Sequence, residues 1–114
     1  MTETAALLEG SRELAGRFKD SELYQNYCRH KKNLESDPPL LAQIEAYKKS
    51  QFELETKRLR EGSVSFDEEK RVAHQYTQLS LSPVAGAFLT CEHELLELYR
   101  QALDTLCEAC EIEF

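Results

Sequence analysis

The sequence predicts an all-α fold: a helical bundle with a long antiparallel helix pair and about five helices, in a single domain over residues 1–114. Three observations predict it. The chain has only three prolines and four glycines, which leaves little material for turns. Glu, Leu, Ala, Lys, Gln and Arg dominate while β-branched residues are scarce, as is typical of helices rather than strands. Apolar residues also recur at alternating spacings of four and three, the period of one helix face.

Two helices are expected in the first third of the chain. The first covers about residues 4–19, although its two glycines weaken it. The second begins near Asp20 or Ser21, either of which can cap it, and ends near residue 35. The apolar stripe of the first helix is Leu7, Ser11, Leu14 and Phe18, and that of the second is Leu23, Tyr27, His30 and Leu34.

The third and fourth helices have clear start signals. Asp37 can accept hydrogen bonds from the free amides of the first turn while Pro38 takes the first helical position. This helix runs to about residue 60, where Gly62 can end it, and spans roughly 35 Å. Ser65, with Glu68 three residues later, forms a capping box for a shorter fourth helix, which carries Val72, Tyr76 and Leu79.

The last helix carries the most information. Ser82 can cap it and Pro83 takes its first position, so it is expected over residues 83–110. The third and fifth helices are expected to run antiparallel, with the short fourth helix as the turn between them. Two apolar rows follow the last helix: a first seam of Val84, Phe88, Cys91, Leu95, Leu98, Ala102 and Thr105, and a second seam of Leu89, Leu96, Tyr99, Leu103, Leu106 and Cys110.

Two adjacent seams give the last helix a wider apolar face than a single neighbouring helix covers. Either this helix is central to the bundle, or its second seam pairs with another chain. The second interpretation is favoured because so small a domain has few helices with which to cover the face. We therefore expect a homodimer or a hetero-oligomer with related helical proteins. The residues expected to form its core and interface together are Phe88, Leu95, Leu96, Leu98, Tyr99 and Leu103.

Charge and motifs narrow the class of function. The net charge of −7 argues against a dedicated binder of nucleic acid or anionic membranes, because such binding depends on cation density. The N-terminal stretch has neither a basic region nor a long apolar run, so we expect no signal peptide, no membrane span and a cytoplasmic location.

The sequence has no glycine-rich phosphate loop, nucleophile elbow or zinc-type histidine pair. We expect no enzymatic activity.

The C-terminal sequence "CEACEIEF" places Cys107 and Cys110 three residues apart. Three interpretations stay open: packing at a helix end, a redox pair, or half of a site for an iron–sulfur cluster or zinc. On the same helix Cys91 lies roughly 24 Å from Cys107, and His93 about 21 Å, so neither can complete a metal site. Cys28 would need a favourable packing of another helix. The remaining ligands must therefore come mostly from a second chain.

Two basic clusters offer a third and weaker alternative, contact with RNA. "RHKK" begins at residue 29 and "KRLR" at residue 57. A solvated helix face is the ordinary interpretation of such runs, and a patch for RNA or an acidic partner is the other. The cations concerned are Arg29, Lys31, Lys32, Lys57, Arg58 and Arg60.

Four stretches of the chain resemble the YlbF/YmcA family of helical proteins. They are "DSELYQNY", "NLESDPPLLAQIEAY", "EGSVSFDEE" and "LSPVAGAFLTCEHELLEL", in the order and spacing of that family. Ser82 stands where the family often has Asn, and both residues cap helices well. Cys91 stands where the family commonly has Ala, which favours a packing role for this thiol. The positions that fit the family patterns are Ser21, Glu22, Tyr24, Tyr27, Leu34, Glu35, Asp37, Pro38, Pro83, Phe88, Leu89, Glu92 and Leu95.

The resemblance implies a cytosolic bacterial regulatory protein that is all-helical, oligomeric and without catalytic activity. It implies, for the YlbF and YmcA branches, a complex with a third protein that carries iron–sulfur clusters on cysteines. That complex supports competence, biofilm formation and sporulation, and influences messenger RNA processing by ribonuclease Y. Other members of the family lack the cysteines and have no assigned role.

Overall fold

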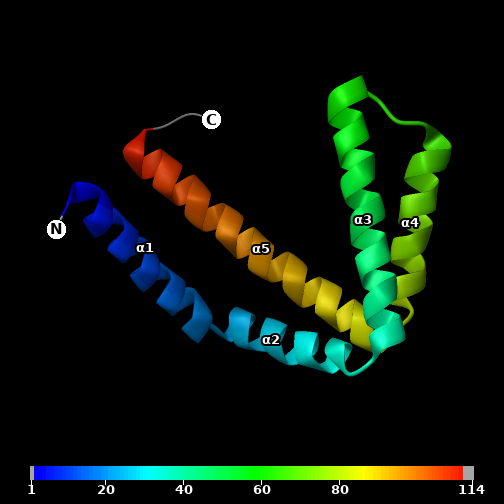
Figure 1. The fold of residues 1–114 in the computed structure, drawn as a ribbon, viewed down its shortest axis with the longest axis horizontal. Coiled ribbons are helices and arrows are strands. Elements are labelled where there is room, and N and C mark those ends of the chain that lie inside the picture. Colours follow the sequence, from blue (N-terminus) through cyan, green and yellow to red (C-terminus); the bar gives the residue numbers. More distant parts are fainter. Residues whose placement is uncertain (1, 112–114) are drawn as a thin grey trace. The chain divides into compact units, whose positions relative to one another are not determined.

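The computed structural model describes residues 2–111, which form five α-helices and no β-strand (Figure 1). The all-α prediction is confirmed, and each expected helix is present within two residues of its predicted bounds. The helices are α1 (Glu3–Asp20), α2 (Glu22–Glu35), α3 (Pro38–Glu61), α4 (Phe66–Ser80) and α5 (Pro83–Cys110).

Side-chain caps explain where these helices begin. The Asp37 carboxylate accepts a hydrogen bond from the Leu40 amide at 3.3 Å, and the Ser65 hydroxyl accepts one from the Glu68 amide at 3.1 Å. Ser82 serves α5 in the same way, accepting from the Ala85 amide. Each cap satisfies an amide that has no partner within its own helix.

Gly62 ends α3 in the left-handed conformation, with φ of 82°, and its amide donates to the Arg58 carbonyl. A residue with a Cβ is disfavoured in this region of backbone space, which is why glycine is suited to the position.

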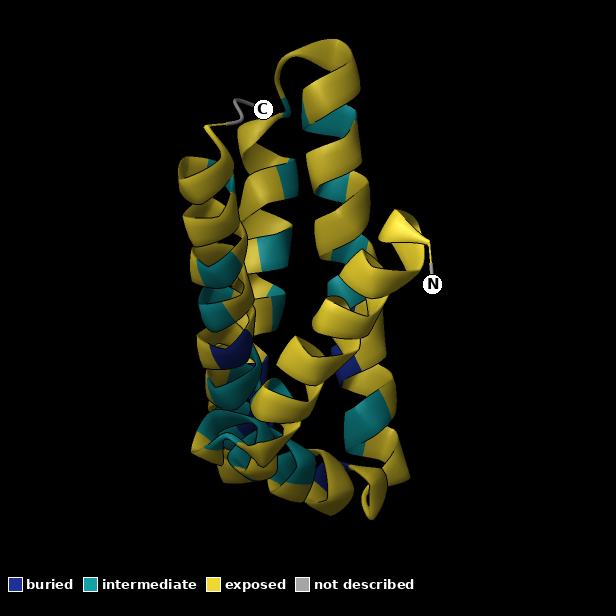
Figure 2. Ribbon diagram, turned by 90° about the vertical axis from the view of Figure 1, so that its left-hand side faces the viewer, coloured by how far each residue is buried: buried dark blue, intermediate teal, exposed yellow. Residues whose placement is uncertain are grey.

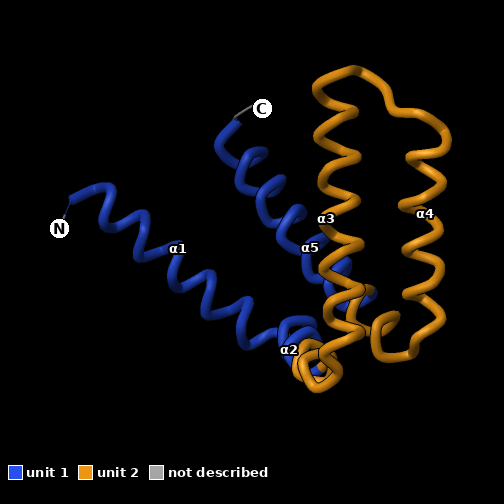
Figure 3. The backbone as a smooth tube through the Cα atoms, turned by 45° about the vertical axis from the view of Figure 1, so that its right-hand side comes forward, with its two compact units in different colours: residues 1–29, 90–114 blue, residues 30–89 orange. Residues whose placement is uncertain are grey.

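The described chain divides into two compact units (Figure 3). Unit 1 contains residues up to 29 together with those from 90 onward, and unit 2 contains residues 30–89. Each unit is described by itself below. The single domain expected over residues 1–114 stays a prediction.

Unit 2 is built on α3 and α4, which lie side by side and run in opposite directions (Figures 1 and 3). The rings of Tyr47 and Tyr76 meet across this pair, with centroids 5.7 Å apart. The helix α4 is therefore a packing partner of α3, and not merely the turn that the sequence was expected to place there. The expected pairing of α3 with α5 involves both units and stays a prediction. The buried residues of unit 2 are Leu34, Ile44, Tyr47, Leu79, Ala85 and Phe88.

Unit 1 contains α1, the first part of α2 and most of α5. Leu95 is its one buried apolar residue among those described, and α1 has no buried residue at all (Figure 2). The helices α1 and α5 contact each other through the rings of Phe18 and Tyr99, whose centroids are 4.7 Å apart. Much of the apolar surface of unit 1 is thus uncovered by the unit itself.

Candidate functional site

The second seam of α5 is exposed over its last four turns. Leu96, Tyr99, Leu103 and Leu106 are 56%, 43%, 57% and 60% exposed. Their spacing of three, four and three places them on one face of the helix. A row of large apolar side chains with this spacing is a surface on which another helix can pack.

The first seam carries the buried residues of α5. Phe88 is 4% exposed and Leu95 5% exposed. The Lys48 ammonium lies 5.2 Å from the centroid of the Phe88 ring, a cation–π contact within unit 2. The side chains of the predicted set therefore divide in two: Phe88 and Leu95 are core residues, while Leu96, Tyr99 and Leu103 remain accessible. Their part in an interface stays a prediction.

Leu98 occupies an intermediate position, half-buried beside a hollow of about 310 Å³ within unit 1. Leu23 of α2 lines the same hollow, so α2 contributes to the environment of α5 there. The remaining lining residues are mostly polar: His93, Glu94, Glu97 and Gln101. Nothing in this lining combines a nucleophile with a base, and it does not resemble a catalytic centre.

Arg100 lies beside the second seam and binds two carboxylates of its own helix. Its guanidinium donates to Glu97 and, at 3.2 Å, to Asp104. These hydrogen bonds and charges lower the pKa of the Glu97 carboxyl and raise the pKa of Arg100. The seam is therefore flanked by an ion-paired polar row, the usual border of a helix-packing face.

A cluster of aromatic rings and a thiol lies next to Tyr99. The Tyr24 and Tyr27 rings are 6.4 Å apart. The pKa of Tyr24 is raised, chiefly by hydrogen bonding with the Cys28 thiol, and the nearby Cys28 charge and burial add to this change. From sequence, Tyr24 was only a position of the family pattern, and Cys28 only a metal ligand that would need a favourable packing of its helix; their proximity to each other was not predicted.

The C-terminal cysteine pair lies at the end of α5, where Cys107 is half-buried and Cys110 exposed. All four cysteines are free thiols. Among the described residues no three side chains of His, Cys, Asp or Glu are grouped so as to hold a metal ion. The described part of this chain therefore does not supply a complete site for zinc or an iron–sulfur cluster, each of which needs about four ligands.

Cys91 is suited to packing rather than to ligation. Burial raises the pKa of its thiol, the Glu94 carboxylate raises it further, and the Arg29 charge opposes this change. A thiol with a raised pKa remains protonated near neutral pH, whereas metal binding and nucleophilic attack need the thiolate. This agrees with its place on the first seam.

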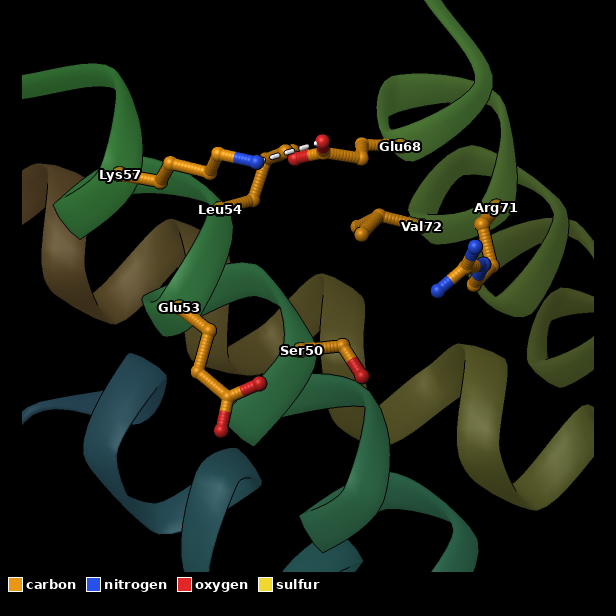
Figure 4. Close-up of a pocket in the computed structure, with 7 residues that line it drawn as sticks. All are labelled: Ser50, Glu53, Leu54, Lys57, Glu68, Arg71 and Val72. Atoms are coloured by element: carbon orange, nitrogen blue, oxygen red, sulfur yellow. Dashed lines mark hydrogen bonds and ion pairs between the residues drawn. The ribbon is translucent and has the colours of Figure 1, made fainter. Parts of the chain in front are cut away.

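Two of the three cations in the basic cluster at residues 57–60 form ion pairs within unit 2. Figure 4 shows the pair between Lys57 and Glu68. Lys57 lies 2.7 Å from Glu68, and Arg58 lies 2.7 Å from Glu55 and 2.9 Å from Glu69. The pairs with Glu68 and Glu69 tie α3 to α4. Beside them lies a hollow of about 360 Å³, lined by Ser50, Glu53, Leu54, Lys57, Glu68, Arg71 and Val72. RNA contact stays a prediction, for which Lys57 and Arg58 are poorly placed because carboxylates already neutralise them.

Arg29 of the other cluster donates to the Asn26 side chain at 2.6 Å within unit 1. Of the helices in the described part, none is both long enough and apolar enough to cross a bilayer.

Comparison with known proteins gives a family match over most of the chain. Residues 7–109 match the model of the family described as "Control of competence regulator ComK, YlbF/YmcA". No solved structure matches the chain significantly.

Three curated relatives carry the name UPF0342 protein. One from Caldicellulosiruptor bescii is 29% identical over 101 residues, covering 89% of this chain and 85% of its own. One from Caldicellulosiruptor saccharolyticus is 28% identical over 101 residues, covering 89% and 84%. One from Desulfitobacterium hafniense is 23% identical over 104 residues, covering 91% and 84%.

Proposed function

Because the chain belongs to the YlbF/YmcA family, linked to control of the competence regulator ComK, we propose that it is a non-enzymatic regulatory or adaptor protein. It acts by presenting an apolar helix face to another helical protein. The partner is a second copy of the chain or a related family member, and the assembly operates in the cytoplasm. Its regulatory output lies in messenger RNA processing and in development, including competence, biofilm formation and sporulation.

One observation carries this proposal: the exposed second seam of α5. Four large apolar residues, Leu96, Tyr99, Leu103 and Leu106, remain between 43% and 60% exposed on a helix face. Leaving such a row in water is unfavourable, and covering it with a second helix removes that apolar surface from solvent.

Sedimentation of the purified chain tests the proposal. We expect the wild-type protein to sediment as an oligomer, alone or mixed with other family members of the same cell. Leu103→Glu places a charge in the middle of the seam and should reduce the mass to that of one chain. Gln101→Glu adds the same charge elsewhere on the helix and should leave the mass unchanged.

A single-chain mass for the wild-type protein, both alone and with those family members, would show that the seam is not an interface. Circular dichroism of Leu103→Glu should match the wild type, because Leu103 is 57% exposed and its replacement removes no core contact.

A second candidate function is a metal or iron–sulfur subunit in which Cys107 and Cys110 supply half of a shared ligand set. The observation that favours it is the exposure of Cys110 at the end of α5, where a second chain can approach the thiol. Anaerobic purification, followed by a visible absorbance spectrum and metal analysis, tests it. Bound iron or zinc that is lost in Cys107→Ser, but retained in Cys91→Ser, is the expected result. Colourless, metal-free protein, alone and with its partners, contradicts it.

A further inference from the structure

The hollow of about 360 Å³ between α3 and α4 lies wholly within unit 2. Its volume is in the range of small-molecule sites, and the proposed function makes no use of it. Its α3 wall extends from Ser50 to Lys57, a length of about 10 Å along the helix axis. A hollow this short is suited to a small molecule rather than to a partner helix.

The ion pair between Lys57 and Glu68 sets the register of α3 against α4. The two atoms lie 2.7 Å apart, and the helices run in opposite directions (Figure 1). Glu53 lies four residues before Lys57 on α3, and Arg71 lies three residues after Glu68 on α4. Glu53 and Arg71 therefore come level with each other across the hollow. The contact between two tyrosine rings farther along the helix pair agrees with this register.

One of these two level pairs is closed and the other is open. Lys57 and Glu68 are in contact, whereas Glu53 and Arg71 form no ion pair with any residue that the structure describes. Figure 4 shows Glu53 and Arg71 on opposite walls of the hollow. The pKa of Glu68 is lowered chiefly by the hydrogen bond from Lys57, and the nearby Arg71 charge adds to this change. A carboxylate and a guanidinium thus stand on the two walls without meeting.

The space between these two charges is lined by apolar side chains. Leu54 and Val72 are half-buried, and Val72 points from α4 toward α3 (Figure 4). The Ser50 hydroxyl adds a neutral hydrogen-bonding group to the lining. A molecule that fits this lining carries a positive and a negative group together with a short apolar body.

We propose that this hollow binds a free α-amino acid with an apolar side chain, such as leucine, as its zwitterion. The ligand carboxylate accepts hydrogen bonds from Arg71, because a planar guanidinium suits a carboxylate. The ligand ammonium group donates to Glu53. The ligand side chain covers Leu54 and Val72, which removes apolar surface from water. This inference goes beyond the proposed function, which concerns the seam of α5 in unit 1.

The exposure of the two charged groups sets the expected affinity. Glu53 and Arg71 are exposed, so water and salt screen their attraction for a ligand. We therefore expect weak binding, with a Kd of about 1 mM at low ionic strength, which becomes weaker as salt is added.

A titration followed by the backbone amide signals in nuclear magnetic resonance tests the inference. L-leucine is added to the isotope-labelled chain, and the signals of residues 50–57 and 68–72 should shift and saturate, while those of unit 1 stay in place. N-acetyl-leucine lacks the ammonium group and leucine amide lacks the carboxylate. Neither should give a saturable shift over the same range of concentrations.

Four variants test the two charges. Arg71→Gln and Glu53→Gln should each weaken the binding of leucine several-fold. Lys70→Gln and Glu45→Gln remove the same charges from the same helices outside the hollow, and they should leave the titration unchanged. All four residues are exposed, so the circular dichroism of each variant should match that of the wild type.

Three results would overturn the inference. The first is a folded wild-type chain whose signals do not shift with leucine, and the second is N-acetyl-leucine binding as well as leucine. The third is a wild-type titration in both Arg71→Gln and Glu53→Gln. Leu103→Glu, which tests the proposed function, should leave the leucine titration unchanged, so failure of either proposal is seen separately from the other.

Discussion

At the scale of single residues, few side chains carry the core of unit 2. Ile44 is 2% exposed on α3. Phe52 lies on the same helix and is 72% exposed. Hydrophobicity alone does not distinguish the two residues, whereas their burial in the folded chain does.

Ile44→Ala should therefore destabilise the protein by about 2–5 kcal/mol, because it removes buried methyl groups and leaves a cavity. Phe52→Ala removes a larger side chain from the surface and should change the free energy of unfolding by no more than about 0.5 kcal/mol. Urea denaturation followed by circular dichroism measures both. Equal losses in the two variants would mean that Phe52 is covered in solution.

The Lys57–Glu68 pair gives stability a defined dependence on pH. The hydrogen bond from Lys57 lowers the pKa of Glu68, so its stabilising contribution is complete above the ordinary carboxyl pKa and disappears as pH falls through the lowered value. The same bond raises the pKa of Lys57, whose contribution is complete below the ordinary lysine pKa and disappears as pH rises through the raised value.

Glu68→Gln should remove both contributions. The loss of stability at acid and at alkaline pH should therefore become shallower than in the wild type. Thermal unfolding across the pH range measures this. Glu45→Gln, an exposed carboxylate on α3, loses the same charge and should retain the wild-type profile. If Glu68→Gln leaves the dependence of thermal stability on pH unchanged, the pair is too exposed to solvent to contribute to the free energy of unfolding.

At the scale of elements, local chemistry made the helix bounds predictable. Asp37, Ser65 and Ser82 cap their helices through neighbours three residues away, and Gly62 ends α3 where expected. The apolar rows were predictable for the same reason, since they depend only on spacing.

Relations between elements were less predictable, because they depend on residues distant in the chain. The pairing of α3 with α4 and the Phe18–Tyr99 contact are of this kind. So are the ion pairs that neutralise Lys57 and Arg58, which sequence alone presents as a basic cluster. The candidate surface itself was predicted as a seam, while the division of the last helix into buried and exposed residues is visible only in the folded chain.

Two glycines test how the backbone conformation of a glycine decides the effect of adding a Cβ atom. Gly62 has a positive φ, so Gly62→Ala should destabilise α3 by about 1–2 kcal/mol. Gly10 lies inside α1 with nothing within 4 Å of an added Cβ, so Gly10→Ala should stabilise that helix by up to about 1 kcal/mol. Urea denaturation measures both changes. A destabilising Gly10→Ala would indicate that another helix approaches α1 closely at that position in the assembled protein.

At the scale of the whole molecule, the two ends of the stability range should lie in α1 and α3. No residue of α1 is buried, so its amides should exchange rapidly with solvent. The helix α3 buries Ile44 and Tyr47, so its amides should stay protected. Hydrogen exchange read by mass spectrometry follows both helices in one sample. Protection of α1 as strong as that of α3 would show that another helix covers α1 in solution.

Thermal stability should depend on protein concentration if the second seam pairs with a second copy, because a partner that binds only the folded chain stabilises it by mass action. A tenfold rise in concentration should add about 1.4 kcal/mol per mole of dimer, raising the melting temperature by a few degrees. Leu103→Glu should abolish the dependence and hold the melting temperature at the dilute wild-type value, whereas Gln101→Glu should preserve it. Differential scanning calorimetry at several concentrations measures all three proteins. A wild-type melting temperature independent of concentration would exclude self-association as a source of stability and leave a related family protein as the only partner for the seam.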